Sequence, residues 1–265
     1  LGQPMPIENQ PGAGTLLGIR MVKSAPADGY TVLATSNTIT ILPSIKLSPG
    51  YDLLKDFAGI GPMVRSPWLM VVGAGEPDRT VADFVARARR DPSPLTFASG
   101  GVGTSPYLGA QSFLKRAGLE ITHVPYKGSG AAMPDLIGGR VTMMFDGVGS
   151  AAAKVRAGQL RPLGVSSAAR IAAFPAIPTI AEQGYPGFES YVYIALFAPA
   201  ATPPEVIAAL SRALREAMAN RTLRERFDAD GIESMAVSPE AFGASLRREL
   251  GDMAKLVGEL GLPKD

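Results

Sequence analysis

The sequence of 265 residues has no cysteine and a single histidine, His123. Without cysteine the chain has no disulfide bridge, no thiolate nucleophile and no cysteine-ligated metal or iron–sulfur site. A lone histidine at the end of an apolar strand lacks the partner ligands of a zinc site, so we interpret His123 as a packed or hydrogen-bonded structural residue. We therefore predict no bound metal.

Long apolar runs and an excess of one charge are also missing. No apolar run reaches about 18 residues, so the sequence predicts no membrane-spanning helix, and its start lacks the basic and apolar regions of a signal peptide. The 26 basic and 24 acidic residues are spread along the chain, and the net charge is only +2. Because no basic patch results, we predict no binding of nucleic acid.

The residues that are present describe a globular chain with room for one or two domains, since 46% are hydrophobic and 19% are charged. Strand-like and helical segments alternate, which favours an α/β fold with mostly parallel strands. We expect strands at 31–35, 60–64, 69–72, 95–98, 121–124, 141–145 and 163–165, and helices at 16–24, 81–89, 107–117, 131–137, 151–157, 203–219 and 239–260.

Two helix starts carry capping signals. Thr80 is followed three residues later by Asp83, and Thr202 precedes Pro203 and Glu205. Both patterns predict a capped helix N-terminus, the second with proline at its first helical position.

The chain is expected to cross twice between two domains, outward near residue 95 and back after the strand-like segment 191–197. We predict a discontinuous domain 1 at residues 1–95 plus 198–265, and domain 2 at residues 96–197. A ligand cleft would lie between the domains at the carboxyl ends of the strands, and two crossings permit hinge closure.

The most informative segment is a turn of small residues that joins an expected strand to an expected helix. It contains the candidate ligand-binding residues Ser99, Gly101, Gly103, Thr104 and Ser105. Glycine lets the backbone approach a ligand, and the N–H groups of a helix start attract anions, so the turn suits a carboxylate. It matches neither the phosphate-binding loop nor the dinucleotide fingerprint, and we predict no cofactor. The alternative is a glycine-rich turn without a ligand.

A second strand end carries Tyr126 and Lys127, and a third carries Asp146 before a glycine. Lys127 either attracts an anion in the cleft or is a solvated surface lysine. Asp146 either faces the cleft, where it would accept from a ligand donor or hold Tyr126 or Lys127, or caps the following turn.

Three polar residues of the other domain, Ser36, Asn37 and Thr38, follow the expected strand 31–35. They are either turn residues or the opposite wall of the pocket. A serine hydrolase would need a positioned nucleophile, base and acid, and the chain has no Gly-x-Ser-x-Gly elbow. We therefore predict that the protein is not an enzyme.

Six ordered motifs that span nearly the whole chain resemble those of the Bug family, the periplasmic solute-binding receptors of tripartite tricarboxylate transporters. They are ENQPGAG at 8–14, APADGYT at 25–31, DLLKDF at 52–57, VPYKGS at 124–129, FD at 145–146 and FPAIPTIAE at 174–182.

The resemblance implies a two-domain Venus-flytrap receptor of type II-like topology, without catalysis. It implies a periplasmic monomer that captures a small carboxylated solute, either a dicarboxylate, a tricarboxylate, an acidic amino acid or an aromatic acid. The solute would pass to membrane permease subunits or be read by a sensor. The family's Gly-x-Gly-Thr-Pro-Ser-His loop falls on residues 101–107, where the last three positions differ.

Members of the family normally carry a signal peptide, a first strand with its helix, and a glycine-rich loop before the segment at which this sequence begins. Residues 1–8 read as the end of a helix, a turn and the start of a strand. We expect exposed apolar surface near this point and hypothesise that half of the carboxylate site is unbuilt. The alternatives are an α/β enzyme acting on a small acid and a ligand-free signalling or scaffold relative.

Overall fold

The computed structural model describes residues 2–91, 95–262 and 264, and the chain forms two compact units. Unit 1 comprises Leu1–Arg65, Tyr193–Glu225 and Glu233–Asp265, and unit 2 comprises Ser66–Val192 and Arg226–Ile232. The chain passes between the units within strands β2 (Phe57–Gly73) and β7 (Tyr191–Pro199), and the short segment Arg226–Ile232 passes once more into unit 2 and back. The sequence prediction put two crossings, near residues 95 and 198. The predicted ligand cleft stays a prediction.

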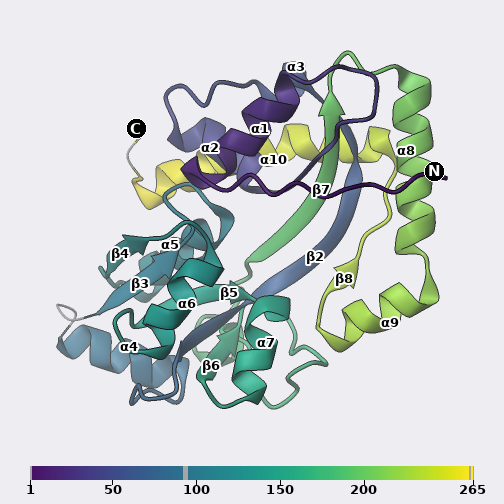
Figure 1. Cartoon of the computed structure of the whole chain (residues 1–265). Coiled ribbons are helices and arrows are strands. Elements are labelled where there is room, and N and C mark those ends of the chain that lie inside the picture. Colours follow the sequence, from purple (N-terminus) through teal and green to yellow (C-terminus); the bar gives the residue numbers. More distant parts are fainter. Residues whose placement is uncertain (1, 92–94, 263, 265) are drawn as a thin grey trace. The chain divides into compact units, whose positions relative to one another are not determined.

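Unit 1 has a small sheet covered by helices. Strand β1 (Leu33–Ser36) pairs antiparallel with β7, which neighbours the first part of β2, and β8 (Glu233–Ser234) pairs antiparallel with β2. The long helix α10 packs against α2, as the yellow and blue-purple ribbons of Figure 1 show. The other elements are η1 (Ala13–Thr15), α1 (Leu16–Lys23), α2 (Thr38–Ile45), α3 (Leu53–Asp56), α8 (Pro204–Met218), α9 (Arg221–Ala229), whose last residues belong to unit 2, and α10 (Pro239–Leu260).

Unit 2 is built on parallel strands: β3 (Thr96–Ser99) lies between β4 (Thr122–Pro125) and β5 (Met143–Gly147) and runs parallel to both. The second part of β2 pairs antiparallel with β5 and with β6 (Leu160–Val165). The helices are α4 (Val81–Arg90), α5 (Ser105–Ala117), α6 (Ser129–Ile137), α7 (Val148–Arg156) and η2 (Ala181–Gln183).

The predicted α/β class is correct, but the strand directions are mixed rather than mostly parallel. Only the β4–β3–β5 core of unit 2 follows the strand–helix–strand repeat, in which each helix returns the chain to the same edge. Strand β2 is longer than predicted, because 60–64 and 69–72 belong to one strand of 17 residues. Its pairing with β5 and β6 is antiparallel.

The two predicted helix caps have different outcomes. The Thr80–Asp83 capping box is present: Asp83 N donates to Thr80 Oγ1 at 3.0 Å, and Thr80 N donates to Asp83 Oδ2 at 3.0 Å. The cap predicted at Thr202 is wrong, because Pro203 is the N-cap residue of α8 and no side chain caps it. The Thr202 hydroxyl is buried instead, without a hydrogen-bond partner among the described residues.

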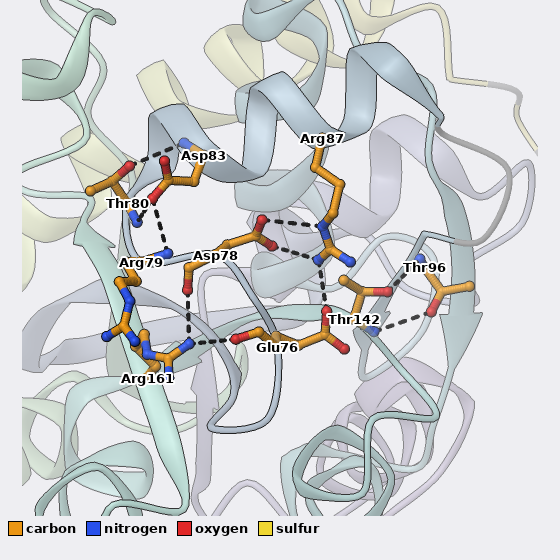
Figure 2. Close-up of polar contacts among 9 residues, drawn as sticks. All are labelled: Glu76, Asp78, Arg79, Thr80, Asp83, Arg87, Thr96, Thr142 and Arg161. Atoms are coloured by element: carbon orange, nitrogen blue, oxygen red, sulfur yellow. Dashed lines mark hydrogen bonds and ion pairs between the residues drawn. The ribbon is translucent and has the colours of Figure 1, made fainter.

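A polar cluster fixes the loop that joins β2 to α4 in unit 2 (Figure 2). The Arg161 guanidinium donates to three loop carbonyls, at 2.8 Å from Ala74 O, 2.5 Å from Glu76 O and 3.0 Å from Asp78 O. Arg87 of α4 donates to the Asp78 carboxylate and pairs with Glu76 at 2.7 Å. Arg87 is the shared partner of both acids, Glu76 and Asp78, and Arg161 binds the loop backbone, so this cluster is structural.

Unit 1 contains an apolar cavity of about 800 Å³. Its walls include the first residues of the chain, one side of α1, β1 and the inner side of α8. Residues 2–12 form neither helix nor strand, which contradicts the predicted strand start, and Ile7 is 88% exposed. No helix in the described ranges is both long and apolar enough to cross a membrane.

Candidate functional site

Three helices of unit 2 begin at the same edge of its sheet. Strands β3, β4 and β5 are parallel, so their carboxyl ends meet at one edge, and α5, α6 and α7 follow them directly. The two turns after β3 and β4 lie side by side, because an added Cβ on Gly100 would be 3.9 Å from Gly128 Cα and Tyr126 N donates to Ser99 O at 2.9 Å. Helix starts carry partial positive charge, so this edge favours an anion.

The turn between β3 and α5 is shaped by two glycines with positive φ, Gly101 at +117° and Gly103 at +83°. Gly101 N donates to Ser99 Oγ at 3.1 Å, so this N–H group is engaged within the turn. Thr104 closes the turn, since its N and its Oγ1 both donate to Gly101 O, at 3.2 and 2.7 Å. Among the described residues, the N–H groups of Val102 and Gly103 have no protein acceptor.

Ser105 is the first residue of α5 and is buried, like Thr104. The sequence therefore predicted a compact turn at this place. The candidate residues of the turn differ, however, in what they contribute to its structure. Gly101 provides the backbone conformation, whereas the N–H groups of Val102 and Gly103 have no acceptor within the described ranges. Val102 was missed, because its side chain carries no polar group that would mark it in a sequence.

The turn after β4 uses its tyrosine for local structure. Tyr126 Oη donates to Asp135 Oδ2 at 2.7 Å, and Arg140 Nε donates to Asp135 Oδ1 at 2.7 Å. The Tyr126 hydrogen bond is the main reason why the pKa of Asp135 is lowered, and the same bond raises the pKa of Tyr126. Lys127 is exposed, whereas Ser129 begins α6.

Asp146 at the end of β5 is almost fully buried, with 1% of its surface exposed. Its Oδ1 accepts from Ser129 Oγ at 2.7 Å and its Oδ2 accepts from Ser150 Oγ at 2.6 Å. The carboxylate thus joins the first turns of α6 and α7. It holds Ser129 and Ser150 rather than the predicted Tyr126 or Lys127. The spacing of four residues from Asp146 to Ser150 at a helix start is the sequence signal that could have identified the second serine.

Ser36, Asn37 and Thr38 lie in unit 1, where β1 ends and α2 begins. Ser36 Oγ donates to Thr38 Oγ1 at 2.9 Å, and Asn37 N donates to Tyr193 O at 3.1 Å. These contacts make the segment a hydrogen-bonded turn of unit 1. Its predicted role as a pocket wall stays a prediction.

His123 precedes the second turn and contacts the first. Its Nε2 lies 2.7 Å from Ser99 Oγ, and its ring lies 4.8 Å from the rings of both Phe97 and Tyr107. Burial lowers the pKa of His123 to about 4, so the ring is neutral at neutral pH. His123 is therefore hydrogen-bonded and packed, as predicted. No cluster of three potential metal ligands occurs in the part of the chain that the structure describes.

Two α/β units joined by strands that run through both define the periplasmic binding protein class of fold. In open α/β sheets, ligands commonly bind at the carboxyl ends of strands, and anions bind at helix starts. Residues 1–262 match the sequence profile of the tripartite tricarboxylate transporter family receptor, and the chain belongs to this family. The resemblance to the Bug proteins is confirmed.

Three known proteins illustrate the relationship. Protein BugT of Bordetella pertussis is 32% identical over 98% of this chain and 81% of its own. The periplasmic binding protein BugD superposes with a TM-score of 0.93, at 28% identity over 97% of this chain and 87% of its own. R. palustris Rpa4515 with adipate superposes with a TM-score of 0.95, at 30% identity over 100% of this chain and 89% of its own.

Proposed function

We propose that the protein is a periplasmic receptor that binds a small dicarboxylate and delivers it to the permease of a tripartite tricarboxylate transporter. The observation that carries the proposal is the turn between β3 and α5, beside three helix starts, where the backbone N–H groups of Val102 and Gly103 find no acceptor in the part of the chain that the structure describes. A carboxylate that accepts these N–H groups gains charge-assisted hydrogen bonds. Adipate in Rpa4515 supports the choice of a dicarboxylate.

The buried Asp146 indicates which of the three helix starts binds a ligand carboxylate. Its two oxygens already accept from Ser129 and Ser150, so it neutralises part of the positive potential of α6 and α7. The start of α5 has no such acid within its turn. We therefore assign one ligand carboxylate to the start of α5.

A thermal-shift screen tests the proposal. Dicarboxylates, citrate, acidic amino acids and aromatic acids are compared with adipamide, which matches adipate in shape and carries no charge. A ligand that binds only the folded protein at 100 times its Kd stabilises it by about 2.7 kcal/mol. We expect a rise in Tm with at least one dicarboxylate and none with the diamide. A panel in which no acid raises Tm contradicts the proposal.

Catalysis is tested with the same acids. Ser99, the serine next to the only histidine, is fully buried, and we expect each acid to be recovered unchanged. NMR of the solution detects any conversion, and conversion of any acid would support the alternative of an α/β enzyme.

A further inference from the structure

We propose that Ser99 and His123 are positioning residues that set the shape of the carboxylate-binding turn, with the neutral imidazole accepting a hydrogen bond from the Ser99 hydroxyl. The inference rests on the proposed function, because it assigns to this pair the orientation of the N–H groups at Val102 and Gly103.

The first step identifies the acceptor of the Ser99 hydrogen bond, since a serine hydroxyl has a single hydrogen to donate. Two acceptors are within reach: His123 Nε2 at 2.7 Å and Gly101 O at 3.3 Å. Gly101 O already accepts from the N and the Oγ1 of Thr104, which occupy its two lone pairs. The Ser99 hydroxyl therefore donates its hydrogen bond to Nε2, which is also the nearer acceptor.

The second step is the state of the imidazole. A ring that accepts at Nε2 is neutral and carries its proton on Nδ1. Phe97 and Tyr107 pack against the ring, and this apolar contact disfavours the charged form. The aromatic residues thus favour the state of His123 that the hydrogen bond requires.

The third step connects the pair to the turn. Because the Ser99 hydroxyl donates its hydrogen bond to His123 Nε2, Ser99 Oγ can use a lone pair to accept from Gly101 N at 3.1 Å. This contact holds Gly101 at φ +117°, a conformation that only glycine adopts readily. The direction of the next two N–H groups follows from this peptide orientation. His123 lies 22 residues after Gly101 in the chain, but the parallel pairing of β3 with β4 puts it directly opposite Phe97.

The experiment compares four variants of the full chain with the wild type. Ser99→Ala removes the hydroxyl that connects His123 to Gly101 N. His123→Leu removes the acceptor of the Ser99 hydrogen bond, and His123→Gln retains an acceptor of similar reach. Ser245→Ala is the matched control, because Ser245 Oγ donates to a backbone carbonyl of α10 in unit 1. Calorimetry measures the affinity for adipate, or for the acid that raises Tm most in the panel, and denaturation measures the folded fraction.

We expect Ser99→Ala and His123→Leu to lower the affinity about tenfold, while His123→Gln recovers most of it and Ser245→Ala has no effect. In the unliganded protein, ¹⁵N NMR should show an unprotonated Nε2 on His123, and the Gly101 amide should exchange faster in Ser99→Ala. Equal affinities in all four variants, or a proton on Nε2, overturn the inference while the wild type still binds acid. A wild type that binds no acid contradicts the proposed function instead.

Discussion

At the residue scale, Glu249 shows how one partly buried carboxyl group organises unit 1. It lies on α10, and its oxygens contact Tyr193 Oη at 2.6 Å and Thr40 Oγ1 at 2.8 Å. Thr40 Oγ1 also lies 2.7 Å from Asn37 O, next to the turn at the start of α2. Burial raises the pKa of Glu249, which favours its protonated form.

This raised pKa predicts that the stability of the protein depends on pH through Glu249. A carboxyl group whose pKa is higher in the folded than in the unfolded state contributes stability below its unfolded pKa, about 4.3. The contribution is lost as the pH rises through the folded pKa. We therefore expect Glu249→Gln, which imitates the protonated form, to gain stability relative to the wild type between pH 5 and pH 8.

Urea unfolding at several pH values measures the effect. Glu225→Gln is the control, since Glu225 is an exposed residue that pairs with Arg221. If the advantage of Glu249→Gln over the wild type does not grow with pH, the assignment is contradicted.

At the element scale, the loop between β2 and α4 is stabilised by ion pairs and side-chain hydrogen bonds rather than by helix or strand structure. Asp78 is 3% exposed, and Arg87 supplies its charged partner from the last turn of α4. A buried ion pair of this kind contributes little net stability, but removal of one partner leaves an uncompensated buried charge.

We expect Arg87→Met to destabilise the protein by about 3 kcal/mol, because Asp78 then loses its guanidinium partner. The control is Arg170→Met, which breaks the exposed pair with Glu182 and should cost less than about 1 kcal/mol. Chemical denaturation measures both. Similar losses of unfolding free energy in the two variants would show that Arg87 is not needed to compensate the buried charge of Asp78.

The elements themselves were largely predictable from periodicity and caps. Helices α1, α4, α5 and α10 lie within a few residues of their predicted ranges, because their apolar residues recur at helical spacing. Helix α2 was missed, since its sequence TITILPSI is rich in β-branched residues and contains a proline, and it is stabilised by burial against α10 instead.

At the scale of the whole molecule, the sequence predicted the number of compact units and the turns at the edge of the unit 2 sheet. Parallel strands force consecutive turns to meet, so Ser99 and Tyr126 could be expected near one another. The partners of Asp146 and of the Gly101 N–H group could not be predicted. They depend on side-chain and peptide orientations, which spacing alone does not determine.

The structure also gives the protein an optical reporter. Its one tryptophan, Trp68, is buried in unit 2 against α5: a Cβ added to Gly109 would lie 3.1 Å from the indole Nε1. Among the described residues the indole N–H has no hydrogen-bond partner.

We expect blue-shifted emission from Trp68, whose intensity changes when an acid occupies the first turn of α5. A fluorescence titration measures this change, and an unchanged spectrum at saturation would contradict it. The helix that would receive the ligand thus lies against the chain's only strong fluorophore, so acid capture can be followed without any label.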